Sequence, residues 1–164
     1  LQLDYSRLHR EWAYTDLPRG IIAERMLLDV NGEPAPDYKA YVIGGKVRFL
    51  QVDRGRFGRD TRNLYSADWE LLPVRLTIEN HAADERPARL PEMLEIAERL
   101  ALAFEFLRVD YYFVDGALYI GELTNYSGAG FERFIPPSFV EELGSYWVVR
   151  RPHASSTQNE SALQ

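Results

Sequence analysis

The most constraining feature of this sequence is a pair of β-branched and aromatic segments, 107–114 and 118–124, separated by Asp-Gly-Ala. This pattern predicts a β-hairpin. The register decides which side chains are buried, because a shift of one residue turns every side chain to the other face. A two-residue turn at Asp115 and Gly116 would place the carboxylate of Glu122 in the core. A three-residue loop, 115–117, avoids this burial and is therefore the predicted connection.

The three-residue loop predicts one apolar face, made of Leu107, Val109, Tyr111, Phe113, Tyr119 and Leu123. On the other face Asp110 then lies directly opposite Glu122, with Arg108 and Thr124 nearby. Two carboxylates in this position repel by a few tenths to about 1 kcal/mol. A divalent cation removes the repulsion, and Mg²⁺ commonly binds one or two carboxylates together with phosphates and water. Two alternatives stay open: both acids are solvated on an exposed face, or Arg108 neutralises one of them.

A second hairpin is predicted around Gly44–Gly45, a dipeptide suited to a two-residue turn with positive φ. If Ile43 pairs with Lys46, one face is apolar and the other is polar and half-solvated. The expected apolar face comprises Tyr38, Ala40, Val42, Val47 and Phe49. The expected polar face comprises Asp37, Lys39, Tyr41, Lys46 and Arg48.

The remaining elements follow from periodicity and from turn residues. A strand is predicted over 21–28, a loop over 31–36 and a long ordered excursion over 55–90 that contains 61–65. Apolar residues at spacings of three and four predict a helix over 90–104, and a shorter helix is predicted over 136–146. This order predicts an α+β fold with a mainly antiparallel sheet. We expect one domain over 1–152 and a mobile tail over 153–164.

Composition narrows the class of protein. With 164 residues, of which 46% are apolar, the chain is long enough for a packed core. The absence of cysteine excludes disulfides and thiolate metal sites, and the three histidines, which we expect at the surface, have no metal-ligand spacing. A net charge of −6 argues against sequence-independent nucleic-acid binding. No apolar run approaches the roughly 18 residues of a membrane span, so a cytoplasmic location is expected.

Two stretches carry a resemblance to a known family. Residues 107–132 resemble the metal-binding hairpin of ATP-grasp enzymes, and residues 37–73 resemble the signature of the TupA-like branch, which is associated with teichuronopeptide and other bacterial surface-polysaccharide biosynthesis. The similarity runs from about Glu11 to Tyr146. It implies that the chain is the C-terminal part of an ATP-grasp domain, with ATP and Mg²⁺ as cofactors.

The resemblance also implies roles for individual residues. Asp110 and Glu122 would bind the metal, and Thr124 occupies the place where many ATP-grasp enzymes have a metal-binding Asn. Glu24 and Met26 lie in a segment similar to the hinge strand that contacts adenine and ribose. An outward position on an edge strand is the alternative for Glu24.

The first hairpin and the loop that follows it supply the other candidates. Asp37 and Lys39 share one strand face, where the acid can accept from ribose hydroxyls and the ammonium can meet a phosphate. Strand faces also carry such residues without a ligand. Lys39 and Arg62 are the candidate catalytic residues. Arg62 and Asn63 lie in the family's loop signature and would bind an acceptor carboxylate or a phosphate. Asp60 stands where relatives often have His.

These implications lead to an expected function with alternatives. The first is part of an ATP-dependent carboxylate–amine ligase acting on a carboxylate or glycan-linked substrate in cell-surface polymer assembly. A truncated non-catalytic nucleotide-binding or assembly module is the second, and a kinase or transferase acting on a glycan is the third. The lysine and glycine-rich loop of an N-terminal ATP-grasp lobe are not found here, so half a nucleotide site is expected, completed by that lobe or by homo-oligomerisation.

Overall fold

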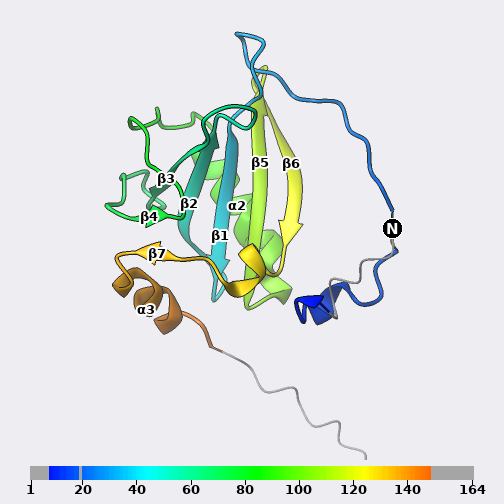
Figure 1. Ribbon diagram of the computed structural model, residues 1–164, viewed down its shortest axis with the longest axis vertical. Coiled ribbons are helices and arrows are strands. Elements are labelled where there is room, and N and C mark those ends of the chain that lie inside the picture. Colours follow the sequence, from blue (N-terminus) through cyan, green and yellow to red (C-terminus); the bar gives the residue numbers. More distant parts are fainter. Residues whose placement is uncertain (1–7, 19, 149–164) are drawn as a thin grey trace, which may run out of the picture.

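The computed structural model describes residues 8–18 and 20–148 and has an α+β fold. Its main sheet is antiparallel, with the strand order β3-β2-β1-β5-β6 (Figure 1). The strands of this sheet are β1 (Asp37–Ile43), β2 (Lys46–Arg54), β3 (Thr61–Tyr65), β5 (Phe106–Val114) and β6 (Ala117–Thr124). A small second sheet pairs β4 (Arg75–Leu76) with β7 (Phe134–Ile135). The helices are α2 (Leu90–Leu100) and α3 (Ser138–Ser145), and the 3₁₀ turns are η1 (Trp12–Tyr14), η2 (Ala101–Ala103) and η3 (Ser127–Gly130).

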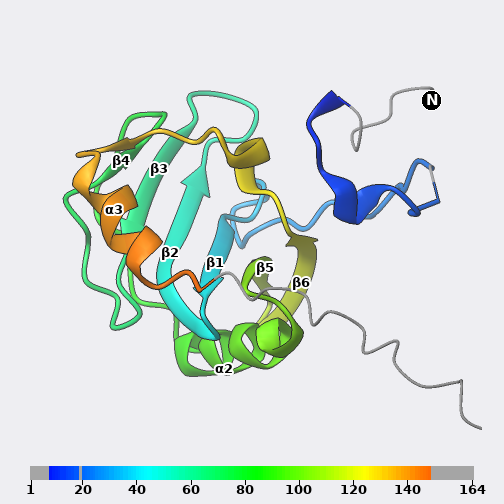
Figure 2. The same ribbon diagram turned by 90° about the horizontal axis from the view of Figure 1, so that it is seen from below.

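Both faces of the main sheet are covered, at least in part. Helix α2 lies on one face, and β4, β7 and α3 lie on the other (Figure 2). The core beneath α2 includes Ala40, Val42, Leu50, Val52, Leu107, Val109, Tyr111, Met93 and Ala97. The opposite core includes Tyr41, Phe49, Leu64, Val74 and Leu76. The prediction of a half-solvated polar face on the first hairpin is therefore wrong, because a second layer covers it.

The first hairpin has the predicted turn but contains a bulge. Ile43 pairs with Lys46 across Gly44–Gly45, whose φ angles are 62° and 77°. The register then shifts, because Val42 pairs with Val47 whereas Tyr41 pairs with Phe49. The extra residue turns Phe49 to the face opposite the prediction, where its ring stacks on Tyr41 at a centroid distance of 4.1 Å.

The second hairpin has a two-residue turn, so the predicted three-residue loop is wrong. Val114 pairs with Ala117, and Asp115 and Gly116 have φ angles of 52° and 74°. A bulge at Gly121 then restores the register in which Asp110 lies directly opposite Glu122, as predicted.

The same bulge changes which residues of β6 reach the core. Tyr119 pairs with Tyr112 and not with a core residue, so it does not join the predicted apolar face. Leu118, opposite Phe113, packs against the core in its place.

The segment 21–28 does not form the predicted strand. Only Leu28 makes a bridge, with Pro34, and the rest is not paired in a sheet. Ile21 and Ile22 are 83% and 84% exposed. In Figure 1 the chain leading to β1 runs outside the sheet. An apolar pattern makes a strand only when another strand is available to pair with it, and residues 8–18 and 20–148 place none beside residues 21–27.

The predicted helices are confirmed. The helix expected over 90–104 is α2 followed by η2, and the helix expected over 136–146 is α3. The excursion over 55–90 contains β3, which pairs with β2 as an edge strand. In the described part of the chain no helix is long and apolar enough to cross a membrane. The tail 153–164 lies outside the described residues.

Candidate functional site

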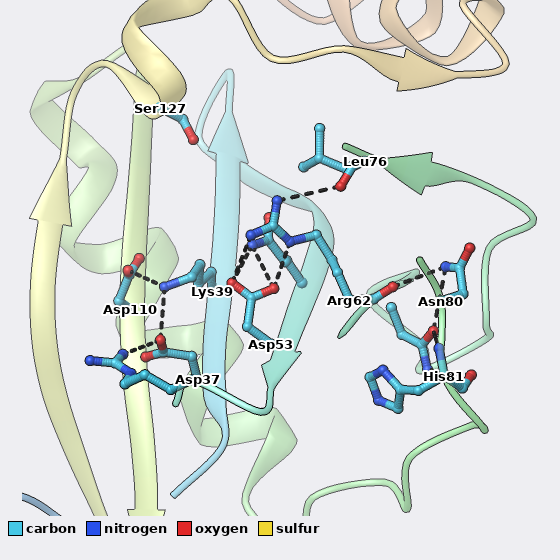
Figure 3. Close-up of polar contacts among 12 residues, drawn as sticks. Asp37, Lys39, Asp53, Arg62, Leu76, Asn80, His81, Asp110 and Ser127 are labelled. Atoms are coloured by element: carbon cyan, nitrogen blue, oxygen red, sulfur yellow. Dashed lines mark hydrogen bonds and ion pairs between the residues drawn. The ribbon is translucent and has the colours of Figure 1, made fainter. Parts of the chain in front are cut away.

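A band of charged and polar side chains crosses the sheet on the face opposite α2. Register places Glu122, Asp110, Lys39 and Gln51 in one row, since each is paired with the next across β6, β5, β1 and β2. A neighbouring row places Asp37, Asp53 and Arg62 in line across β1, β2 and β3. We call these residues, together with Arg108, the polar band; Figure 3 shows most of its members.

Asp110 lies at the centre of the charged part of the polar band. Its side chain is only 4% exposed, and both of its oxygens accept charged hydrogen bonds. The ammonium of Lys39 donates to Oδ2 at 2.8 Å. The guanidinium of Arg108 donates to Oδ1 at 2.7 Å and to Oδ2 at 2.9 Å. This bidentate geometry makes the interaction both strong and oriented.

Burial of Arg108 would lower the pKa of its guanidinium, but the hydrogen bonds and the charge of Asp110 raise that pKa above its ordinary value. Arg108 is therefore permanently charged. The second alternative considered from the sequence, neutralisation of one of the two acids by Arg108, describes this state of the site.

Glu122 is the solvent-exposed member of the carboxylate pair. Its side chain is 61% exposed, and Arg108 Nη2 lies 3.5 Å from its Oε2. The hydroxyl of Thr124 donates to Oε1 at 2.9 Å. Thr124 thus holds the carboxylate of Glu122 in place.

The donor chemistry of this pair suits a divalent cation. Two carboxylates face each other, and a cationic group already contacts both. Mg²⁺ needs only one or two carboxylates when phosphates and water complete its shell. Among the described residues no group of three or more His, Cys, Asp or Glu side chains could hold a metal by itself. Asp110 and Glu122 therefore fit a metal shared with another ligand, provided that Arg108 gives way.

Asp37 and Lys39 are brought together beside Asp110. Lys39 Nζ lies 3.4 Å from Asp37 Oδ2, and Arg56 also donates to that oxygen. Burial would raise the pKa of the Asp37 carboxyl, but Lys39, Tyr112 and Arg56 together bring it below its ordinary value. Asp37 Oδ1 is buried without a hydrogen-bond partner. An unsatisfied buried acceptor of this kind is uncommon in folded proteins.

Tyr112 completes this corner of the site. Arg56 donates to its hydroxyl at 2.9 Å. Burial and the neighbouring Asp37 raise the pKa of Tyr112 to about 12. Tyr112 therefore acts at neutral pH as a neutral hydrogen-bonding group.

Arg62 lies at the far side of the polar band, on β3. Its guanidinium donates to both carboxylate oxygens of Asp53, at 2.6 and 2.9 Å. Burial alone would lower the pKa of the Arg62 guanidinium, but the hydrogen bonds and charge of Asp53 outweigh burial and raise that pKa. Asn63 faces away from the polar band: it is fully buried, and its amide contacts Tyr65 and the backbone near His81. Asn63 has a structural role here, whereas Arg62 reaches the candidate site.

A chain of hydrogen bonds links the two ends of the polar band, and sequence reasoning missed its middle members. Arg108 Nη1 donates to Ser127 Oγ at 3.1 Å, and Ser127 lies 3.0 Å from the hydroxyl of Tyr41. Tyr41 donates to Gln51 at 2.9 Å, and Gln51 donates to Asp53 at 2.8 Å. The alternation of Gln51 and Asp53 along β2 is the sequence signal that could have pointed to this face, but it was not used.

Glu24 and Met26 are not brought to the polar band. Both are exposed, Met26 to 54%, on the unpaired segment before β1. Their expected contact with adenine and ribose would require that segment to lie against the sheet.

Two pockets flank the polar band. A pocket of about 600 Å³ is lined by, among others, Asp37, Asp53, Arg56, Asp60 and Arg62. A smaller pocket of about 260 Å³ has aromatic walls and opens beside Ser127; its lining includes Tyr41, Phe49, Phe106, Tyr126 and Trp147. The site therefore combines a charged surface with space for ligands at both ends.

Comparison with known proteins places this arrangement in a family. No curated protein and no solved structure matches the chain. The family model described as TupA-like ATPgrasp matches residues 1–148, which include the whole polar band and both pockets. The chain therefore belongs to the TupA-like ATP-grasp family.

Proposed function

We propose that this chain forms part of an ATP-dependent, Mg²⁺-requiring carboxylate–amine ligase, and that the polar band binds the nucleotide phosphates. The observation that carries the proposal is the pairing of Asp110 with Glu122 beside the cations of Lys39 and Arg108. Family membership supports it, because ATP-grasp domains are nucleotide-binding units. Bound Mg²⁺ would lie at Asp110 and Glu122 and offset charge on the phosphates.

The residues of the chain would act mainly by electrostatics and positioning. Lys39 would donate from its ammonium to a phosphate oxygen, and Arg62 would hold an acceptor carboxylate or a phosphate once it turns from Asp53. Asp37 Oδ1 would accept a hydrogen bond from a ribose hydroxyl. Glu24 and Met26 would meet adenine and ribose if the segment 21–28 lies against the sheet in the complete site.

The reaction itself would proceed in two substitutions. A carboxylate oxygen of the acceptor attacks the γ-phosphorus, and the bond to the ADP oxygen breaks, which gives an acyl phosphate and ADP. An amine then attacks the acyl carbon, loses its proton and expels inorganic phosphate, so that an amide remains. We place the acceptor among the amino-acid or glycan-linked carboxylates of bacterial surface-polysaccharide and teichuronopeptide assembly, and the reaction in the cytoplasm, where ATP is available.

One observation favours a second candidate, a non-catalytic nucleotide-binding or assembly module. Both oxygens of Asp110 are already held by cationic side chains, as expected for a carboxylate that serves structure only. Trapping distinguishes the candidates: with a ligase, hydroxylamine converts the acyl phosphate into a hydroxamate, whereas a non-catalytic module consumes no ATP. A kinase acting on a glycan consumes ATP but leaves a phosphate ester and no hydroxamate.

The first test is calorimetric titration of Mg·ATP into the chain and into the double variant Asp110→Asn/Glu122→Gln. The matched control is Glu79→Gln/Glu95→Gln, which neutralises two acids that are 65% and 70% exposed outside the polar band. Binding that is lost in the first variant and kept in the control supports the proposal. Equal binding in all three proteins would refute the role of Asp110 and Glu122, whereas no binding by well-folded wild type would refute nucleotide binding by this chain alone.

A further inference from the structure

Arg108 occupies the position from which both candidate metal ligands are reached. Its guanidinium contacts Asp110 at 2.7 and 2.9 Å and Glu122 at 3.5 Å. Arg108 and Asp110 are 13% and 4% exposed, so their contact is shielded from solvent and from screening by salt, whereas the contact with Glu122, which is 61% exposed, meets solvent. A cation that binds the two carboxylates must therefore compete with a guanidinium already in place.

The charge balance makes this competition unfavourable for a metal alone. Asp110 and Glu122 carry two negative charges, and Lys39 and Arg108 carry two positive charges in contact with them. A divalent cation added to this set creates a net positive cluster at a largely buried carboxylate. An uncompensated charge at a buried position raises the free energy of the folded state. Nucleotide phosphates bring the negative charge that restores the balance.

Both cationic side chains have a second acceptor within reach. Arg108 also donates to Ser127 at 3.1 Å, and Lys39 also lies 3.4 Å from Asp37. Each can therefore leave Asp110 without losing all of its partners. Phosphate oxygens would then accept the hydrogen bonds that Arg108 and Lys39 no longer make to Asp110.

We propose that Arg108 makes metal binding at Asp110 and Glu122 dependent on the nucleotide. The phosphates draw Arg108 away from the carboxylates, and only then would Asp110 and Glu122 be free to hold the metal. The coupling is reciprocal, so the metal strengthens nucleotide binding by the same factor. This inference rests on the proposed function, because it assumes that the polar band binds phosphates.

The test uses Mn²⁺ as the metal and measures its free concentration by electron paramagnetic resonance. Wild type is titrated alone and with a non-hydrolysable ATP analogue. Arg108→Gln, which keeps hydrogen-bonding capacity but removes the charge, and Arg108→Lys, which keeps the charge, are titrated in the same way. Arg75→Gln is the matched control, because Arg75 pairs with Glu79 on the surface and lies outside the polar band.

Wild type is expected to bind Mn²⁺ at least about tenfold more tightly with the analogue than without it. Arg108→Gln is expected to bind Mn²⁺ alone about tenfold more tightly than wild type and to lose most of the dependence on the analogue. Arg75→Gln should behave like wild type, and Arg108→Lys, which keeps the charge but loses the bidentate geometry, should retain part of the dependence on the analogue. Circular dichroism establishes that each variant is folded before it is titrated.

Two results overturn the inference and are distinguishable from each other. If wild type binds Mn²⁺ with the analogue but Arg108→Gln binds Mn²⁺ alone no more tightly, the role of Arg108 is wrong and the proposed function stands. If folded wild type and all variants bind neither Mn²⁺ nor the analogue, the proposed function fails together with the inference.

Discussion

The ammonium of Lys39 lies 2.8 Å from Oδ2 of Asp110, and the two residues face each other directly across β1 and β5. Both side chains are almost fully buried, at 12% and 4% exposure. A buried charge pair of this kind holds its partners in fixed positions, and removing one partner leaves the other uncompensated. Lys39 therefore fixes the carboxylate that is proposed to bind the metal.

Replacing Lys39 by Met is expected to weaken binding of Mg·ATP by about 10- to 100-fold, because one charge-assisted hydrogen bond to a phosphate is lost. Isothermal titration calorimetry measures the change. Lys46→Met is the control: Lys46 is 66% exposed and pairs with Glu98 outside the polar band. Equal affinities for the two variants would mean that Lys39 does not contact the nucleotide.

Asp37 is expected to make the stability of the fold depend on pH. Its folded pKa lies below the ordinary value of 3.8, so the folded state favours the charged carboxylate. The resulting stabilisation is fully present above pH 3.8 and is lost as the pH falls through the folded pKa. Asp37→Asn should therefore be less stable than wild type at neutral pH, with a difference that shrinks in acid.

Urea unfolding at a series of pH values measures this difference. Glu95→Gln, which removes an acid that is 70% exposed, is the control and should leave the pH dependence of wild type unchanged. A difference between wild type and Asp37→Asn that stays constant down to the lowest pH would rule out the depressed pKa.

The hydroxyl of Tyr65 joins β3 to the loop before α2. It accepts from the backbone N–H of Asp84 at 2.6 Å and donates to the carboxylate of Asp84 at 2.9 Å. Tyr65→Phe should lower the free energy of unfolding by about 1–3 kcal/mol, because buried groups of Asp84 lose a partner. Tyr119→Phe, at a residue that is 44% exposed, should change it little. Equal effects in urea unfolding would show that the Tyr65 hydroxyl is not needed.

Gly55 closes the turn between β2 and β3 with a φ angle of 82°. A Cβ atom there would also collide with the backbone carbonyl of Arg59. Gly45 has a similar φ angle of 77° but open space around it. Gly45→Ala is expected to cost about 1 kcal/mol from the backbone conformation alone, and Gly55→Ala is expected to cost more. Thermal unfolding of the two variants compares them, and a smaller effect at Gly55 would contradict the packing of this turn.

Local patterns predicted the elements whose residues interact within short distances along the chain. Spacings of three and four predicted α2, the dipeptide Gly44–Gly45 predicted the first hairpin, and two β-branched and aromatic segments predicted the second, although with a loop that is one residue too long. The bulges were not predicted, although Gly121 inside a strand was a signal for one. A Cβ atom at Gly121 would come within 2.6 Å of the ring of Tyr112, which explains why glycine is needed there.

Burial was harder to predict wherever a distant segment supplies the cover. His81 was expected at the surface, yet its side chain is 15% exposed and its Nε2 lies 2.9 Å from Asp84 Oδ2. Tyr41 was placed on a half-solvated face and is 2% exposed, because β7 and α3 pack over that face. Segments that arrive from about 90 residues along the chain leave no mark in the local pattern of the strand that they cover.

The sequence by itself determined the two hairpins, the main helix and the pairing of Asp110 with Glu122, since each depends on residues close together in the chain. It also placed Arg108 beside Asp110, because residues two apart share a strand face. Only the tertiary structure decided that Lys39 lies at Asp110 and that Arg62 joins the same band of side chains. The first depends on β1 and β5, strands far apart in the sequence that lie side by side, and the second on the pairing of β3 with β2 after the loop over 55–60; both pairings are set by the packing of the whole sheet.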